Sequence, residues 1–275
     1  MARRIRTRTA LLAAGTAAVV AAGVSMAFPA AAAQTPGTAR PTVVLVHGAF
    51  ADASSWNGVI ARLRKDGYPV RATANPLRGL PTDVAALKDV LRSVDGPIVL
   101  VGHSYGGVVI TSAAAGDPDV KALVYVTAFA PEAGEPLGEL LAHPVAHPTP
   151  ALPLVAVPTT AADGTQDVDL YIDPAKFRET FAADVDANTA ANMAVTQRPA
   201  SQSSFGHAGT AAAWKTVPSW YLVAKQDRAI APDLQRYMAQ RANSHTEEVN
   251  GSHAVMVSRP GVVAHFIEDA ARGTR

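Results

Sequence analysis

The chain has 275 residues, of which 48% are hydrophobic and 17% charged, so it can bury a large core and lacks the composition of a disordered protein. The absence of cysteine excludes disulfides, thiolate metal sites and a cysteine nucleophile. Residues 34–275 hold 20 basic against 23 acidic side chains, which excludes a basic nucleic-acid surface.

The first 33 residues have the three-part plan of a secretory signal peptide. Four arginines stand within residues 3–8, an apolar run extends from about Ala10 to Phe28, and Ala31–Ala33 forms an A-x-A site. An uncleaved membrane anchor is the alternative, because about 19 apolar residues just span a bilayer. Alanine and glycine dominate the run and insert weakly, so we expect cleavage after residue 33 and an exported, extracytoplasmic protein.

The rest of the chain alternates predicted strands and helices. Strands are indicated by apolar, β-branched runs, and helices by apolar residues spaced three and four apart. In chain order we expect strand 41–47, helix 54–66, strand 68–74, helix 82–92, strand 97–102, helix 106–115, strand 120–129, strand 217–224, helix 232–242, strand 245–249 and helix 260–272. Strands separated by such helices predict an α/β fold, a mostly parallel sheet with helices on both faces.

The segment from about residue 131 to 213 interrupts this alternation. It is rich in proline, has no apolar run as strong as those of the sheet, and shows helical spacing at 175–185 and 187–197. An insertion between two core strands is typical of a lid over the carboxyl end of a sheet. We therefore expect one domain over 34–275, with its core in 40–130 and 214–275 and a helical cap at about 131–213.

The sequence Gly102-His-Ser-Tyr-Gly106 matches the pattern G-x-S-x-G and joins a predicted strand to a predicted helix. Such a sharp turn strains the backbone of Ser104, and side chains at residues 102 and 106 would clash. The turn presents the hydroxyl and points the helix N-terminus at developing negative charge. The motif also occurs by chance, but its strand-to-helix context makes Ser104 the candidate nucleophile.

A serine nucleophile needs a base, and the base needs a carboxylate that orients it. Asp227 follows the predicted strand 217–224, and His253 follows the strand 245–249. The chain order Ser104, Asp227, His253 is the one expected when nucleophile, acid and base follow successive strands of the sheet.

Other residues compete for these roles. Asp227 could instead cap the helix at 232, although Asp233 is the better cap, and Glu132 and Glu135 are distant alternatives for the acid. His47 is expected to shape the turn after the first strand. Prolines at 144 and 148 prevent the helix that would align the two histidines at 143 and 147, so no metal site is expected.

The turn His47-Gly-Ala-Phe50 can present a backbone N–H toward the Ser104 hydroxyl. With the N–H of Tyr105 it would form a two-donor oxyanion hole. Backbone donors leave no side-chain signature, so the sequence does not single out one residue of this turn. Ala49 is the expected donor, and Phe50 is the alternative. Four residues are candidates for lining the substrate pocket, and each could equally be plain core: Phe50, Tyr105, Phe129 and Met256.

These motifs together resemble the α/β-hydrolase superfamily, over 41–271. The branch they resemble contains plant methyl-ester hydrolases and hydroxynitrile lyases. The matching pieces are Val43–Ala49, the helix with Trp56, Val99–Gly107, Asp227 and Gly251–His253. The resemblance implies a serine triad of Ser104, Asp227 and His253, oxyanion donors at Ala49 and Tyr105, and a mobile cap.

The chain also departs from parts of this branch. The lyases carry a bulkier hydroxyl residue at position 48 and a lysine after the base, where this chain has Gly48 and Ala254. Cyanohydrin cleavage is therefore not expected. Epoxide hydrolases and haloalkane dehalogenases of the superfamily use aspartate in place of Ser104, which disfavours those reactions.

The expected function is hydrolysis of small to medium uncharged carboxylic esters or lactones through an acyl-enzyme. No cofactor or metal is implied, and the expected partner is a small-molecule ester, with no nucleic acid and no membrane after signal cleavage. Three alternatives remain: a ligand-binding receptor on a hydrolase scaffold, a carbon–carbon bond hydrolase, and a cofactor-free haloperoxidase.

Overall fold

The computed structural model describes residues 40–160 and 164–274, which form one compact unit. The predicted signal peptide and its cleavage site lie outside the described residues. Within those residues, no helix combines the length and the apolarity that crossing a membrane requires.

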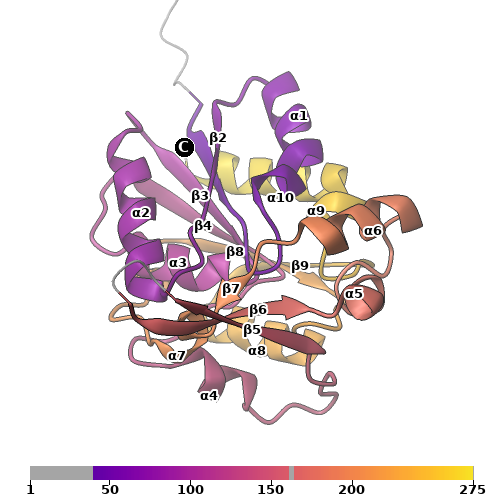
Figure 1. Ribbon diagram of the computed structural model, residues 1–275. Helices are drawn as coiled ribbons and strands as arrows, with labels where there is room; N and C mark the ends of the chain where they lie inside the picture. Colours follow the sequence, from indigo (N-terminus) through magenta and orange to yellow (C-terminus); the bar gives the residue numbers. More distant parts are fainter. Residues whose placement is uncertain (1–39, 161–163, 275) are drawn as a thin grey trace, which may run out of the picture. The chain divides into compact units, whose positions relative to one another are not determined.

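A six-stranded parallel sheet forms the centre of this unit (Figure 1). Its strands are β1 (Thr42–Val46), β2 (Val70–Thr73), β3 (Ile98–His103), β4 (Val120–Val126), β8 (Ser219–Ala224) and β9 (His245–Val249). The order across the sheet is β2-β1-β3-β4-β8-β9. All six predicted strands are confirmed, with ends that differ by up to three residues. Because the strands are all parallel, their carboxyl ends lie at the same edge of the sheet.

Helices cover both faces of the sheet because its central strands are apolar on both sides (Figure 1). One face packs against α2 (Leu80–Arg92), α3 (Gly106–Ala113) and α8 (Pro232–Arg241). The other face packs against α1 (Asn57–Lys65), α9 (Val255–Ser258) and α10 (Pro260–Gly273). Short 3₁₀ turns occur at η1 (Ala53–Trp56) and η2 (Ala213–Lys215).

The insertion between β4 and β8 contains both helices and strands. Its elements are α4 (Leu137–Leu141), β5 (Leu154–Thr160), β6 (Gln166–Ile172), α5 (Pro174–Thr180), α6 (Ala187–Thr196), β7 (Ala200–Ser201) and α7 (Ser203–Gly206). The expectation of a helical cap was therefore incomplete, because β5, β6 and β7 form an antiparallel sheet.

The physical reason for this difference is the edge position of β5. The Asp173 N–H donates to the Pro153 carbonyl, so odd-numbered residues of β5 bond to β6 and the nitrogen of Pro158 faces outward. An edge strand tolerates proline there, because no ladder hydrogen bond is lost. Most of β5 is also exposed, so it lacks the alternation of buried and exposed residues that predicts a strand.

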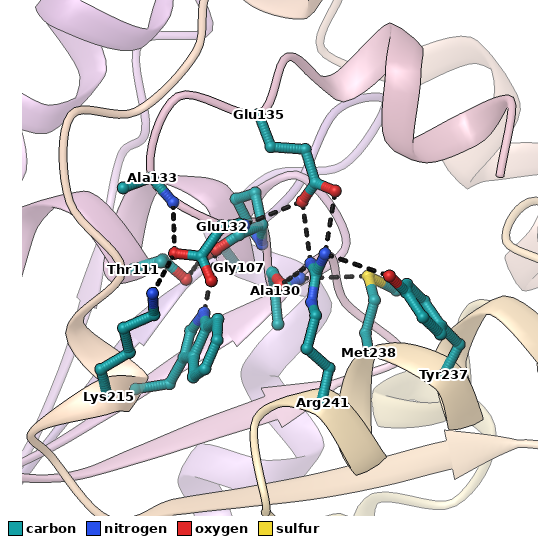
Figure 2. A network of polar contacts seen from close by, with 12 residues as sticks. Gly107, Thr111, Ala130, Glu132, Ala133, Glu135, Lys215, Tyr237, Met238 and Arg241 are labelled. Carbon is teal, nitrogen blue, oxygen red and sulfur yellow. Dashed lines mark hydrogen bonds and ion pairs between the residues drawn. The ribbon is translucent and has the colours of Figure 1, made fainter.

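Ion pairs fasten the start of the insertion to the core (Figure 2). Arg241 of α8 donates to both carboxylate oxygens of Glu135 and to the carbonyl of Ala130 at 2.8–2.9 Å. Lys215, where the chain returns to the core, pairs with Glu132 at 2.7 Å. The two glutamates considered as alternative acids therefore hold the base of the insertion.

Candidate active site

Ser104 lies in a tight turn between β3 and α3 and has a left-handed backbone, with φ of 52°. A Cβ at Gly102 would stand 2.7 Å from the Gly106 carbonyl oxygen, and one at Gly106 would stand 2.6 Å from the Val46 carbonyl oxygen. The predicted steric need for both glycines is therefore present in the structure. Ser104 is 7% exposed, and its strain is the kind that accumulates at functional sites.

His253 and Asp227 form a buried pair at the carboxyl edge of the sheet. His253 Nδ1 lies 2.7 Å from Asp227 Oδ2, and the two residues are 1% and 2% exposed. The loop of His253 lies against the turn of Ser104, because His103 Nε2 donates to the His253 carbonyl at 2.9 Å and the two rings are 4.7 Å apart. The structure thus brings the three predicted residues to one edge.

Four hydrogen bonds hold the Asp227 carboxylate. Oδ1 accepts from the N–H groups of Ala229 and Ile230 at 2.7 and 2.9 Å. Oδ2 accepts from His253 and from the side-chain amide of Gln235, the latter at 2.8 Å. Helix α8 has no side-chain cap, so neither Asp227 nor Asp233 fills that alternative role. The carboxylate can hold the imidazole in the tautomer that carries a proton on Nδ1.

The turn after β1 approaches Ser104 closely. A Cβ at Gly48 would lie 2.6 Å from that of Ser104. In the described part of the chain, the N–H groups of Ala49 and Tyr105 have no hydrogen-bond partner, whereas that of Phe50 donates to the Arg198 carbonyl at 3.0 Å. The contact with Arg198 thus removes the alternative donor and leaves the two predicted ones free.

A buried carboxyl anchors the side chain of Tyr105. The Tyr105 hydroxyl donates to Asp83 Oδ2 at 2.8 Å, and the other oxygen of Asp83 accepts from the Arg78 N–H at 3.0 Å. Burial raises the pKa of Asp83 and that of Tyr105, because it disfavours the charged form of each. Helix α2 therefore fixes the residue that follows the nucleophile.

The insertion contacts the loop of the base directly. The ring of Phe181 meets that of His253 edge to face, with centroids 4.8 Å apart, and the Phe181 carbonyl accepts from the Ala254 N–H at 2.9 Å. Asp184 accepts a hydrogen bond from the Ser252 hydroxyl. These contacts flank His253 on both sides along the chain, so the insertion helps to hold the candidate base in place.

A cavity of about 600 Å³ lies between the insertion and the core. Phe50, Leu152, Leu170 and Phe205 contribute to its lining, and none of the described lining residues is charged. A second cavity of about 140 Å³ also includes Phe50, together with polar side chains. Phe50 thus lines both cavities, whereas Ser104 and His253 line neither of them.

The other pocket candidates lie elsewhere. Phe129 is 5% exposed and lines neither cavity, and its N–H donates to the Ser104 carbonyl at 3.1 Å. Met256 is fully buried among the residues of α1 and α10 on the opposite face of the sheet. It is therefore a core residue, and Val257 beside it is the one that reaches the smaller cavity.

The remaining histidines have structural surroundings. His47 accepts from the Asn75 N–H at 3.0 Å and lies 2.9 Å from the Gly48 carbonyl, so it shapes its turn as expected. His147 pairs with Asp233, and the ring of His143 stacks on Tyr237. Over residues 40–160 and 164–274, no group of three His, Asp or Glu side chains is placed to hold a metal ion.

Sequence reasoning missed three residues of this site: Gln235, Phe181 and Asp184. Gln235 carried a detectable signal, because it is the polar member of an otherwise apolar stripe on α8 that includes Leu234, Met238 and Ala239. A polar residue on a buried helix face indicates a hydrogen-bonded role. Phe181 and Asp184 belong to the insertion and show no comparable local pattern.

Comparison with known proteins agrees with this geometry. The sequence profile of the alpha/beta hydrolase family matches residues 43–266, so the chain belongs to that family. It is 28% identical to the alpha/beta hydrolase nvfD of Aspergillus novofumigatus over 255 residues, which cover 84% of this chain and 97% of the relative. It is also 28% identical to esterase PIR7B of Oryza sativa subsp. japonica over 244 residues, or 79% and 90% of the two chains.

Among solved structures, polyneuridine aldehyde esterase superposes with a TM-score of 0.73 at 18% identity, covering 84% of this chain and 98% of that one. This likeness confirms the predicted fold, and the expected membership of the plant esterase-like branch is confirmed by these findings together. The relatives support the interpretation of the chain as an ester-hydrolysing enzyme.

Proposed function

We propose that this protein hydrolyses carboxylic esters through Ser104, His253 and Asp227. The observation that carries the proposal is the buried 2.7 Å contact between His253 and Asp227, beside a serine held in a strained turn. A serine, an imidazole and an orienting carboxylate are the parts that acyl transfer needs.

In the proposed reaction, His253 removes the Ser104 proton as Oγ attacks the ester carbonyl. The N–H groups of Ala49 and Tyr105 receive the negative charge of the tetrahedral intermediate, for which their unpaired state suits them. The carbon–oxygen bond to the alcohol breaks, and His253 returns the proton to the leaving oxygen. Water then attacks the acyl-enzyme by the same steps and releases the acid.

The lining of the larger cavity supports an uncharged, apolar ester or lactone as the substrate. A volume of about 600 Å³ is within the usual range for small-molecule sites. The described residues of its lining are mostly apolar and include no charged side chain, so the burial of a charged substituent there would be unfavourable.

The direct test is hydrolysis of p-nitrophenyl acetate, butyrate and octanoate by the purified protein and by Ser104→Ala. We expect turnover by the wild type and its loss in the variant. Ser112→Ala is a matched control, because Ser112 is a buried serine of α3 whose hydroxyl has no hydrogen-bond partner among residues 40–160 and 164–274. Unchanged activity in Ser104→Ala would remove the mechanism, and binding without turnover by the wild type would favour a receptor.

We also propose that residues 1–33 direct export and are removed. The support is the order of cationic, apolar and small-residue segments in the sequence. Mass spectrometry of the protein recovered from the culture medium of an expressing bacterium should give a chain beginning at Gln34. Retention of the full chain in the cell membrane would contradict the proposal.

A further inference from the structure

Gln235 lies beside the Asp227 carboxylate and bonds to Oδ2, the same oxygen that meets His253. It is fully buried, and every polar group of its side chain has a partner. Its Nε2 donates to Asp227 Oδ2 at 2.8 Å and to the Ile230 carbonyl at 2.9 Å, while its Oε1 accepts from the Ala224 N–H at 3.1 Å.

This arrangement fixes the orientation of the amide. Oε1 faces the Ala224 N–H at the end of β8, and a reversed amide would bring two donors together there. The NH₂ group must therefore face Asp227. Because both of its hydrogens are used by different acceptors, the amide has one position relative to β8 and the loop that follows.

We propose that Gln235 is a positioning residue for the hydrolysis, an inference that depends on the proposed role of Asp227. Gln235 holds Oδ2 where that oxygen meets His253 Nδ1, and it stabilises the ionised carboxylate with a donor that cannot leave the site. The two N–H donors on Oδ1 come from the loop after Asp227, whereas Gln235 belongs to a helix packed on the sheet. The orientation of His253 is thereby fixed relative to helix α8, which packs on the sheet.

A purely structural role makes a different prediction. Gln235 also joins the end of β8 to the following loop, so its removal should lower stability in either case. A donor to the carboxylate has a further effect, because Asp227 with one donor fewer stabilises an imidazolium more strongly. The acidic limb of the kcat/KM profile should then move to higher pH, which loss of packing alone would not cause.

Two variants separate these roles. Gln235→Met keeps the volume and removes the donor, and Gln235→Glu donates to Asp227 only while its own carboxyl is protonated. Adjacent carboxyl groups share one proton at low pH and repel one another once both are ionised. By analogy with outer partners of metal-bound histidines, we expect Gln235→Met to lower kcat by about 10- to 100-fold, with KM changed less than about threefold. Its acidic limb should move to higher pH.

For Gln235→Glu we expect a pH range in which the activity of the variant falls with rising pH while the activity of the wild type rises. Gln240→Met is the matched control, because Gln240 is an exposed glutamine of the same helix. The measurements are steady-state pH profiles on a p-nitrophenyl ester, with circular dichroism to confirm folding. If Gln235→Met does not fold, the pH profile of Gln235→Glu decides the question alone.

A wild-type kcat and pH profile in Gln235→Met, or a Gln235→Glu profile parallel to that of the wild type, would overturn the positioning role. Failure of the proposed function is a separate result, because it requires activity in Ser104→Ala. An inactive Ser104→Ala with unaffected Gln235 variants removes only the role of Gln235.

Discussion

The ring of Phe181 meets the ring of His253 edge to face at 4.8 Å, although the two residues belong to different parts of the domain. Phe181 follows α5 of the insertion, and His253 follows the last strand of the core. His253 is therefore packed between the insertion and the core rather than standing free above the sheet.

Replacing Phe181 with leucine should weaken catalysis more than binding. The smaller side chain leaves space beside the imidazole, and we expect kcat to fall roughly tenfold with little change in KM. Phe177→Leu is the control, because Phe177 is fully buried and its ring packs against that of Phe181, with centroids 5.0 Å apart, rather than against that of His253. Steady-state kinetics on both variants test this prediction. Equal losses of kcat in Phe181→Leu and Phe177→Leu would contradict it.

Asp227→Asn should leave the shape of the site nearly intact and still abolish most turnover. An amide in this place favours the wrong imidazole tautomer, and in serine hydrolases such a change lowers kcat by on the order of 10⁴. Asp233→Asn serves as a control on α8, because Asp233 pairs with the exposed His147. A kcat within tenfold of the wild type would exclude Asp227 as the orienting acid.

Gly48→Ala should inactivate the enzyme through steric conflict. Its Cβ would stand 2.6 Å from Ser104 Cβ, so either the turn or the nucleophile must move. A displacement near 1 Å at a reacting group is expected to lower kcat/KM by about 100-fold. Gly206→Ala places its Cβ in open space and should retain activity. Kinetics on the two variants test the close approach of residue 48 to Ser104. Full activity in Gly48→Ala would refute it.

The unfolding free energy should decrease as the pH falls below about 6.5, because the site contains a buried neutral histidine. Burial, and then the charge of neighbouring His253, hold the pKa of His103 well below its ordinary value of 6.5. The unfolded chain takes up a proton in this range and the folded chain does not. One such group contributes a slope of up to about 1.4 kcal/mol per pH unit.

Denaturant unfolding at several pH values measures this slope. His103→Gln keeps a donor for the His253 carbonyl and should flatten the curve below pH 6.5. His265→Gln, at an exposed position, should keep the wild-type slope. Equal slopes in the wild type and His103→Gln would show that His103 titrates normally in the folded state.

The pair Arg241–Glu135 should contribute measurably to stability. Both side chains are about 20% exposed, and the guanidinium also donates to the Ala130 carbonyl (Figure 2). A double-mutant cycle with Arg241→Met and Glu135→Gln should give a coupling energy of about 1–2 kcal/mol, above the usual value for exposed pairs. The exposed pair Arg92–Asp89 provides the comparison and should give a smaller value. Similar coupling in the two pairs would contradict the expectation.

The sheet and the nucleophile turn were predictable because their causes are local. Fully buried parallel strands require unbroken apolar runs, and the turn at Ser104 requires glycine at 102 and 106. The meeting of Asp227 and His253 was predictable from topology, since parallel strands place the residues after their ends along one edge. In each case the signal lies within a few residues of the feature itself.

The insertion and the supports of the site depend on contacts between distant residues. The strand β5 is stabilised by one neighbour and is exposed elsewhere, so its own sequence has no burial pattern. Phe181 reaches His253 from 72 positions earlier in the chain. Met256 was misplaced because a short helix turns its side chain toward the core, which the sequence around His253 does not reveal.

The insertion makes hydrogen bonds and a ring contact with residues of the candidate active site. Its residues Phe181 and Asp184 hold the loop of the base, and Arg198 occupies the amide next to the expected oxyanion donor. An opening of the whole insertion as one rigid body would therefore disassemble the catalytic geometry. Exchanging this segment with that of a relative should therefore alter the rate constant of the chemical step as well as substrate preference.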